Sequence, residues 1–195
     1  MNIRKFELSD LDQIYGIYQK VSLNRNKIGN SEYETLIQKN GFLLGLDTKE
    51  DLEKEIDKAN YVTVAEENNI IVGYLIADDS DDQKFNDDEY KTWFDNDLKT
   101  IYYYNQKVMT LATIAVDPEY GGKGVGKILF EELIQWLKNN NYEYIFSIMT
   151  MAPLTNCATV LWHTKMGYKR LAMGRPRKLF NLENYVGILM YKKLQ

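Results

Sequence analysis

A glycine-rich turn between an apolar run and an amphipathic helical pattern constrains this chain most. The apolar run is Leu111–Val116, the turn is Gly121–Lys127, and apolar residues recur at helical spacing over Ile128–Leu137. Glycines let a backbone approach a ligand closely, and the N–H groups at the start of a helix have no partner within the helix. Such N–H groups attract anions. An extended run, a glycine-rich turn and a helix in this order therefore predict a phosphate-binding site.

Two common phosphate-binding motifs fit this turn poorly. Gly121–Lys127 has the spacing of a nucleoside-triphosphate loop, but Ile128 stands where that loop needs Ser or Thr to hold Mg²⁺. A dinucleotide-binding fingerprint needs a third glycine, and Lys127 or Leu129 occupies that position, depending on which glycine begins the motif. The turn therefore disfavours a magnesium nucleotide and a dinucleotide as its ligand.

The rest of the sequence predicts a mixed α/β domain. Extended runs are expected at 2–8, 61–66, 70–77, 108–116, 144–149, 168–172 and 185–192. Helices are expected at 9–21, 31–39, 49–58, 124–140 and 156–165. Thr48 is a candidate helix cap, Glu67-Asn68-Asn69 a hairpin turn, and Gly167 a helix end. We expect one domain over residues 1–195, with a mixed central sheet of about seven strands flanked by helices.

The segment Asp78–Lys107 interrupts this layout. Its first part is acidic and its second part is aromatic. The acidic residues are Asp78, Asp79, Asp81, Asp82, Asp87, Asp88 and Glu89, and the aromatic residues are Tyr90, Trp93, Phe94, Tyr102, Tyr103 and Tyr104. One interpretation is a solvated acidic loop followed by a strand extension. The other is a lid or substrate-facing insertion, since long loops in compact domains are often functional.

Charge and cysteine content exclude several classes of protein. The net charge of −4 argues against a general nucleic-acid binder. Cys157 is the single cysteine, so the chain cannot form an internal disulfide, as is usual in a reducing compartment. No apolar run approaches the roughly 18 residues of a membrane span, and the segment that starts at Met1 lacks the features of a signal peptide. We therefore expect a cytoplasmic protein that binds neither nucleic acid nor membrane.

The turn resembles the acyl-CoA-binding motif of the GNAT superfamily of N-acetyltransferases, Gln/Arg-x-x-Gly-x-Gly/Ala. Gly124 and Gly126 occupy the two small-residue positions, whereas Gly121 stands where the family usually has Gln or Arg. Three further matches extend the resemblance over nearly all of the chain outside Asp78–Lys107. They are Val116-Asp117-Pro118 before the turn, Asn156 eleven residues before Gly167-Tyr168, and Gly73-Tyr74 on an expected strand.

This resemblance implies a GNAT fold, in which two neighbouring strands splay apart to form the acyl-CoA cleft. It also implies which residues bind coenzyme A: Ile114, Ala115, Val116, Gly121, Gly122, Lys123, Gly124, Val125, Gly126, Lys127 and Asn156. Because Gly121 has no side chain to contribute, the turn is expected to bind the pyrophosphate mainly through its backbone. Plainer interpretations stay open, namely a helix cap for Asn156, solvated side chains for the lysines, and core packing for residues 114–116.

The catalytic groups are less defined. The family often has a tyrosine that protonates the departing thiolate, and the matching position here is His163, the single histidine of the chain. The resemblance therefore makes His163 a candidate general acid, although a plain packing role is also open. The base that deprotonates the amine is not identified; Asp117, Glu34 and the acids of 78–97 are candidates. Cys157 has no base placed beside it, so a nucleophilic role is disfavoured.

The resemblance implies an enzyme that transfers an acetyl group from acetyl-CoA to a primary amine by direct attack in a ternary complex, without a metal. The acceptor is a small molecule or a peptide. The acidic insertion suggests that it is cationic, with Asp87, Asp88 and Glu89 as the groups that attract it. One alternative is a non-catalytic acyl-CoA-binding module, and another is a peptide-binding protein that uses the tyrosine-rich insertion. A homodimer is compatible with the sequence.

Overall fold

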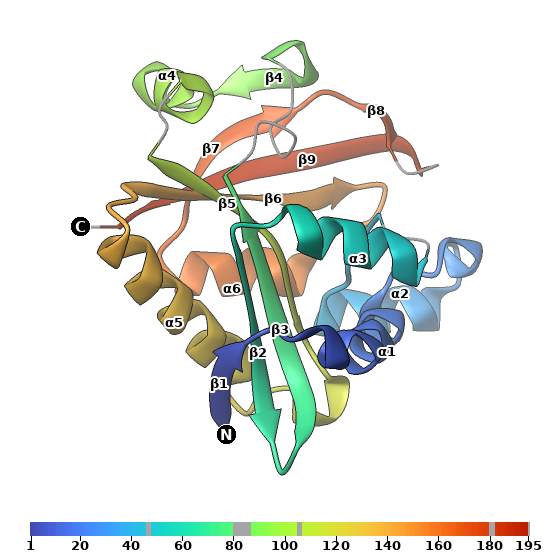
Figure 1. The fold of residues 1–195 in the computed structure, drawn as a ribbon. Helices are drawn as coiled ribbons and strands as arrows, with labels where there is room; N and C mark the ends of the chain where they lie inside the picture. Colours follow the sequence, from blue (N-terminus) through green and yellow to red (C-terminus); the bar gives the residue numbers. More distant parts are fainter. Residues whose placement is uncertain (46–47, 80–86, 105–106, 180–181, 195) are drawn as a thin grey trace.

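The computed structural model describes residues 1–45, 48–79, 87–104, 107–179 and 182–194. Within these ranges, nine strands form a mixed sheet in the order β1-β2-β3-β5-β6-β9-β7-β4, and β8 pairs with β9. Helices cover both faces of this sheet (Figure 1). None of the described helices is both long enough and apolar enough to cross a membrane. The mixed α/β fold expected from the sequence is confirmed.

The strands and helices have the following bounds. The strands are β1 (Asn2–Lys5), β2 (Tyr61–Glu67), β3 (Ile70–Asp78), β4 (Tyr90–Trp93), β5 (Val108–Val116), β6 (Tyr144–Ala152), β7 (Lys169–Gly174), β8 (Arg177–Leu179) and β9 (Leu182–Lys193). The α-helices are α1 (Leu11–Val21), α2 (Ser31–Asn40), α3 (Lys49–Lys58), α4 (Asn96–Tyr104), α5 (Val125–Asn139) and α6 (Cys157–Lys165). Short 3₁₀ turns are η1 (Leu8–Asp10), η2 (Arg25–Lys27), η4 (Asp87–Glu89) and η5 (Pro118–Tyr120).

Local sequence signals explain several of these boundaries. The Thr48 hydroxyl accepts a hydrogen bond from the Asp51 N–H at 3.1 Å and caps α3, as expected. Asn68 and Asn69 have φ values of 54° and 65°, which is the left-handed conformation that a tight hairpin requires. Gly167 follows α6 with a φ of 87° and ends that helix. These short-range predictions are confirmed.

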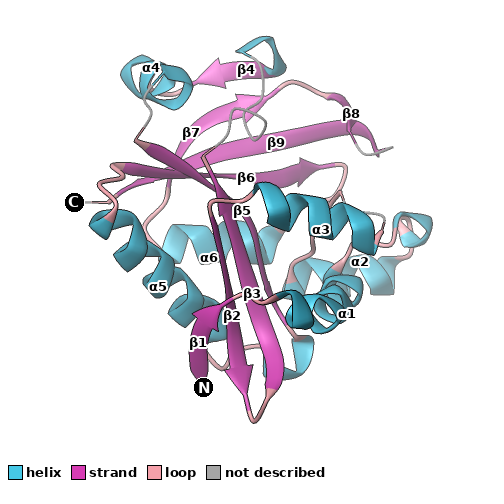
Figure 2. Ribbon diagram, in the orientation of Figure 1, coloured by secondary structure: helices cyan, strands magenta, loops and turns pink. Residues whose placement is uncertain are grey.

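Strands β5 and β6 separate part-way along their length. They pair in parallel only where Val108–Thr110 faces Tyr144–Phe146. Beyond that point β5 continues beside β3, and β6 continues beside β9. Figure 2 shows the two halves of the sheet running in different directions from this point. The predicted splayed strand pair is therefore present, and it leaves the edge of β5 from Leu111 onward without a strand neighbour on that side.

A β-bulge lies on β5 just after the two strands separate. Ile76 pairs with Thr113 and Ala77 with Leu111, so Ala112 is an extra residue on β5. In a regular strand, residues 111 and 113 would face the same side of the sheet. Instead, Leu111 packs in the core beneath α5, whereas the Thr113 hydroxyl meets a side chain of α3. The bulge thus turns Thr113 to the opposite face.

The segment 78–107 is mostly not a loop within its described residues. It contains η4, the edge strand β4 and the helix α4, and β4 pairs with β7. Its aromatic residues Tyr90 and Tyr102 are buried in a cluster that includes Phe146 and Leu189 of the sheet. Asp81 and Asp82, part of the expected acidic loop, lie outside the described residues. The aromatic half therefore contains a strand, as one of the two interpretations expected, and it covers an apolar face of the sheet.

Two strands were not expected, and they explain why nine are present where about seven were predicted. The first is β4, which lies in the insertion. The second is β8, which lies between the strands expected at 168–172 and 185–192. Helix α2 begins at Ser31 as expected, and its cap is the Asn30 side chain, which accepts from the Tyr33 N–H at 3.0 Å. Each difference follows from a hydrogen bond whose partner the sequence pattern does not reveal.

Candidate functional site

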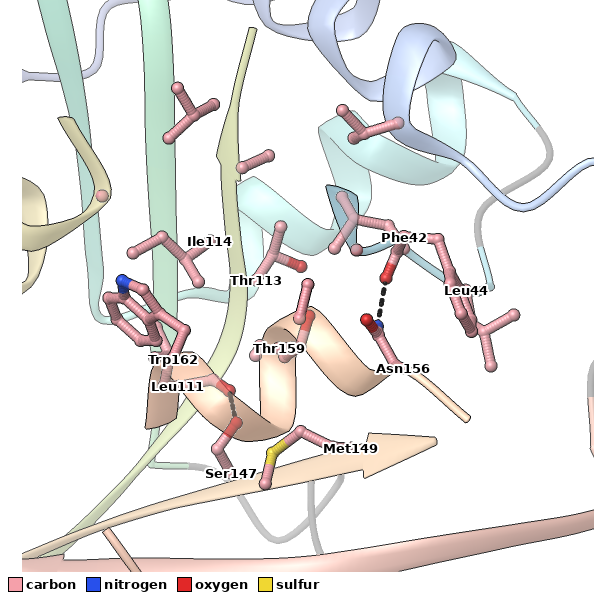
Figure 3. A pocket seen from close by; sticks show the side chains of 18 of the residues that line it. Phe42, Leu44, Leu111, Thr113, Ile114, Ser147, Met149, Asn156, Thr159 and Trp162 are labelled. Atoms are coloured by element: carbon pink, nitrogen blue, oxygen red, sulfur yellow. Dashed lines mark hydrogen bonds between the residues drawn. The ribbon is translucent and has the colours of Figure 1, made fainter. Parts of the chain in front are cut away.

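A cleft of about 1130 Å³ lies between the separated ends of β5 and β6 (Figure 3). At the point of separation, the Ser147 hydroxyl of β6 donates a hydrogen bond to the Leu111 carbonyl of β5 at 3.2 Å. The other walls are α3, α6, the loop 41–45 and the glycine-rich turn at the start of α5. Ile114, Ala115 and Val116, which the sequence assigned to the ligand arm, all line the cleft. The free edge of β5 is therefore open to a ligand.

The glycine-rich turn opens into this cleft. Gly122 and Gly124 have φ values of 75° and 84°, which side chains other than glycine rarely adopt. The first helical hydrogen bond of α5 runs from the Ile128 N–H to the Gly124 carbonyl at 3.1 Å. The backbone N–H groups without a partner among the described residues are those of Gly122, Gly124, Val125, Gly126 and Lys127. Unpaired N–H groups at a helix start are suited to binding an anion.

Gly121 and Gly126 play different parts in this turn. Gly121 has a φ of −57°, and its N–H donates to the Pro118 carbonyl at 3.1 Å, so it ends the turn η5 and offers no free donor. Gly126 lies in the first turn of α5, where an added Cβ would lie 3.6 Å from Val116 and 3.7 Å from the Trp162 ring nitrogen. Gly121 therefore lines the cleft without offering a free N–H group, and the free donors begin at Gly122.

The two lysines of the turn are exposed. The Lys123 ammonium lies 4.3 Å from the centre of the Tyr120 ring, and Lys123 does not line the cleft. The Lys127 ammonium lies 3.6 Å from the Glu131 carboxylate, and Lys127 lies at the cleft wall. An anion in the turn would meet the backbone N–H groups first, as the sequence predicted from the absence of a side chain at Gly121.

Asn156 is buried at the start of α6 and lines the cleft. Its side-chain nitrogen donates to the Phe42 carbonyl at 2.7 Å, as Figure 3 shows. The side chain makes no capping bond to α6, so the plain helix-cap interpretation is wrong. The Oδ1 atom is buried without a partner in the described part of the chain. Because an unsatisfied buried acceptor costs about 1–3 kcal/mol, this atom is suited to a ligand N–H.

His163 lies in the wall of the cleft and is 2% exposed. Its Nδ1 atom lies 2.8 Å from the Thr159 carbonyl, so Nδ1 carries the proton, and Nε2 has no partner in the described structure. The rings of Trp162 and Tyr168 pack against it edge to face. Burial lowers the pKa of His163 to about 4. At neutral pH its Nε2 atom can accept a proton but has none to donate, which speaks against the expected general-acid role.

A carboxylate that the sequence analysis did not select lies in the cleft. Glu55 of α3 accepts a hydrogen bond from the Thr113 hydroxyl at 3.1 Å, and both residues line the cleft. Burial raises the pKa of Glu55, and the nearby charge of Asp78 raises it further. A signal existed in the sequence: Glu55 lies between the helix positions of Leu52 and Ile56, which face the core. A charged residue on the apolar stripe of a helix indicates a polar site beneath it.

The other candidate acids have structural roles. Asp117 accepts from the Lys20 ammonium at 2.6 Å and from the Glu119 N–H at 3.1 Å. Glu34 is partly exposed and accepts from the Gly29 N–H at 2.7 Å. Cys157 is exposed at the start of α6. None of these three lines the cleft.

Among the described acids of the insertion, only Asp78 lines the cleft. Asp87 accepts from the Lys99 ammonium at 2.6 Å and from the Trp93 ring N–H at 2.9 Å. Glu89 forms an ion pair with Arg177 of β8. Asp87 and Glu89 thus hold the insertion together and fasten it to the sheet, so they do not support the predicted attraction of a cationic acceptor. Among the described side chains, no group of three or more His, Cys, Asp or Glu could hold a metal ion.

Comparison with known proteins gives two findings. A family model described as the acetyltransferase (GNAT) family matches residues 30–168. No curated protein matches the chain. The first finding covers the cleft residues from Glu55 to His163 and therefore both the turn and the two separated strands.

Solved structures share this fold at low sequence identity. The ribosomal-protein-S18-alanine N-acetyltransferase from Escherichia coli has 15% identity and a TM-score of 0.64, with 100% of this chain and 94% of that chain covered. The protein smu.2055 from Streptococcus mutans UA159 has 18% identity and a TM-score of 0.68, with 100% of both chains covered. An aminoglycoside 6′-N-acetyltransferase complexed with coenzyme A has 13% identity and a TM-score of 0.65, with 100% and 98% covered. Because the sequence identities are this low, the comparisons with solved structures show a shared fold and no shared activity.

Proposed function

Because this chain belongs to the acetyltransferase (GNAT) family, we propose that it transfers an acetyl group from acetyl-CoA to a primary amine. The observation that carries this proposal is the set of five free N–H groups between Gly122 and Lys127, that of Lys123 excepted, at the end of the cleft between β5 and β6. A pyrophosphate needs donors in place of water, and this helix start supplies them. The cleft then offers a path from the turn to the point where the strands separate.

The residues of the cleft fit the parts of acetyl-CoA. The free N–H groups of the turn would hold the pyrophosphate. The open edge of β5 at 114–116 and the unpaired Oδ1 of Asn156 would hold the amide groups of the pantetheine arm. The thioester supplies the acetyl group, and a backbone N–H on the open edge of β5 would polarise its carbonyl. Most of this binding comes from backbone groups, which explains why Gly121 is tolerated where the family usually has a longer side chain.

Transfer requires the acceptor amine to be unprotonated and close to the thioester carbon. We propose direct attack, because Cys157, the single thiol, is exposed outside the cleft and cannot carry the acyl group. His163 is neutral at physiological pH, and we propose that it packs against the ligand arm and does not protonate the leaving thiolate. The thiolate then takes its proton from the attacking ammonium or from water.

The test is thiol release by the purified protein with acetyl-CoA and a panel of amines, together with calorimetric titration of coenzyme A. The panel contains spermidine, kanamycin, a peptide with an N-terminal alanine and a peptide with an internal lysine. We expect binding of coenzyme A and amine-dependent thiol release with at least one of them. Binding without release on any amine supports the alternative, a non-catalytic acyl-CoA-binding module. Absence of binding refutes both.

A further inference from the structure

We propose that Glu55, held by Thr113 on the bulged strand β5, receives the ammonium group of the acceptor and removes its proton. This inference rests on the proposed function, because it assigns the acceptor end of the same cleft. It concerns a residue of α3, a helix in which no functional residue was expected.

The position of the pair follows from the bulge. Thr113 lies two residues beyond Leu111, whose carbonyl marks the point where β5 and β6 separate. The extra residue Ala112 turns Thr113 away from α5 and toward α3, where its hydroxyl donates to Glu55 at 3.1 Å. The Glu55 carboxylate thus lies beside the open part of β5, on the face opposite α5. A coenzyme held at the start of α5 and an amine held at Glu55 would approach the same strand from opposite faces.

The charges around Glu55 favour a cation deep in the cleft. Asp78 of β3 is buried and raises the pKa of Glu55 through its charge. Lys54 and Asp51 also line the cleft from α3, and both are more exposed than Asp78. The Lys54 ammonium lies 3.6 Å from the Asp51 carboxylate, so this part of the rim carries both charges. Lys58 is exposed on the same helix. Glu55 and Asp78 are therefore more buried than Lys54 and Lys58, which suits a primary ammonium group held inside the cleft.

A second observation points to a ligand in the same place. Tyr74 of β3 is fully buried, and its hydroxyl has no hydrogen-bond partner in the described part of the chain. The charge of Glu55 contributes to raising the pKa of Tyr74, and so does Tyr18 of α1, which lines the cleft. A buried hydroxyl without a partner is rare in folded proteins and is usually satisfied by a ligand or an ordered water. Tyr74 does not itself line the cleft, but its hydroxyl is close enough to Glu55 for the charge of Glu55 to act on it.

The proton transfer balances as follows. The ammonium gives one proton to the Glu55 carboxylate and becomes an amine with a free electron pair. That pair forms the bond from nitrogen to the carbonyl carbon, the bond from carbon to sulfur breaks, and its electrons go to sulfur. The second proton of the nitrogen passes to sulfur and completes the thiol, and Glu55 returns its proton to water. The raised pKa of Glu55 suits this role, because a general base works best when its pKa is near the operating pH.

The experiment compares Glu55→Gln with Glu53→Gln, a matched change on the same helix at a residue that does not line the cleft. The amine is the panel member with the highest turnover by the wild type. For Glu55→Gln we expect kcat/KM for the amine to fall about 100-fold at neutral pH, whereas the affinity for coenzyme A stays within about twofold. Glu53→Gln should match the wild type in both measurements.

A second pair of variants tests the role of Thr113. The hydrogen bond from Thr113 lowers the pKa of Glu55, so its loss in Thr113→Val should move the acidic limb of the kcat/KM profile to higher pH. Thr113→Ser keeps the hydroxyl and should keep the profile.

If the wild type is active and Glu55→Gln retains both its rate and its pH profile, this inference is wrong and the proposed function stands. The inference is also wrong if Glu55→Gln loses coenzyme affinity and activity together. If the wild type acetylates no amine, the proposed function and this inference both fail.

Discussion

Acidification should destabilise this protein through His163. The imidazole is buried between Trp162 and Tyr168, and its folded-state pKa is about 4, against 6.5 for the free side chain. The unfolded chain therefore binds a proton more tightly than the folded chain. The stability associated with a neutral His163 is fully present above pH 6.5 and is lost as the pH falls through about 4.

The size of the effect follows from the two pKa values. One pKa unit corresponds to about 1.4 kcal/mol, so the full loss below both values is about 3 kcal/mol. Near pH 5 most folded molecules still have a neutral His163, and the loss of unfolding free energy is already about 2 kcal/mol. A loss of this size is a large part of the ~5–15 kcal/mol that stabilises a typical domain.

The assay is urea denaturation of the wild type, His163→Gln and His163→Phe at several pH values between 7 and 4.5. Neither variant titrates at residue 163, whereas the other titratable groups are the same in all three proteins. We therefore expect the wild type to lose about 2 kcal/mol relative to both variants between pH 7 and pH 5. Parallel pH dependence in all three proteins would refute a buried neutral His163. It would also reopen the possibility that the imidazolium form protonates the leaving thiolate.

The remaining predictions concern the turn and the N-terminal ion pairs. Gly124→Ala should lower the free energy of unfolding by about 1–2 kcal/mol, because Gly124 has a left-handed φ of 84°, and calorimetry should show weaker coenzyme A binding. Gly16→Ala is the opposite case: Gly16 is helical and an added Cβ meets nothing within 4 Å, so thermal unfolding should show a gain of about 0.5–1 kcal/mol. Asp10→Asn should cost about 2 kcal/mol in urea denaturation, because Arg4 loses a partner held by bonds of 2.7 and 2.8 Å. An unchanged midpoint in Asp10→Asn would mean that Glu66 alone satisfies Arg4.

The elements fixed by short-range chemistry were predictable from the sequence. Thr48 caps α3, Asn68 and Asn69 form the hairpin turn, and Gly124 precedes α5. Each of these depends on a residue type that meets a backbone requirement within a few positions. The splayed strand pair was also expected, although from the resemblance of the turn and not from hydrophobic periodicity.

The pairings between distant residues were not predictable in the same way. Strand β4 exists because Tyr90 and Trp93 find partners on β7, more than seventy residues away along the chain. Asn156 donates to Phe42, which is 114 positions away, so its side chain leaves its own helix uncapped. No periodicity in the local sequence marks either contact. The roles of the turn residues in coenzyme binding remain predictions that the cleft geometry supports.

Glu55 shows a different limit of sequence analysis. Its side chain belongs to the site because a bulge on β5 turns Thr113 toward α3. A bulge is one extra residue in a strand, and nothing in the apolar run 108–116 marks Ala112 as that residue. The acid itself was visible beside Leu52 and Ile56, but its partner on the sheet was not.

The insertion leaves the sheet and returns to it at the same place. Asp78 at the end of β3 pairs with Thr110 near the start of β5, so a short hairpin turn could join the two strands directly. Such a shortened chain would keep the connection of the strands, but it would expose the apolar face formed by Val108, Phe146 and Leu189, which α4 and β4 now cover. The sequence of the sheet is therefore adapted to the presence of the insertion. A relative without the insertion should therefore carry polar residues on that face.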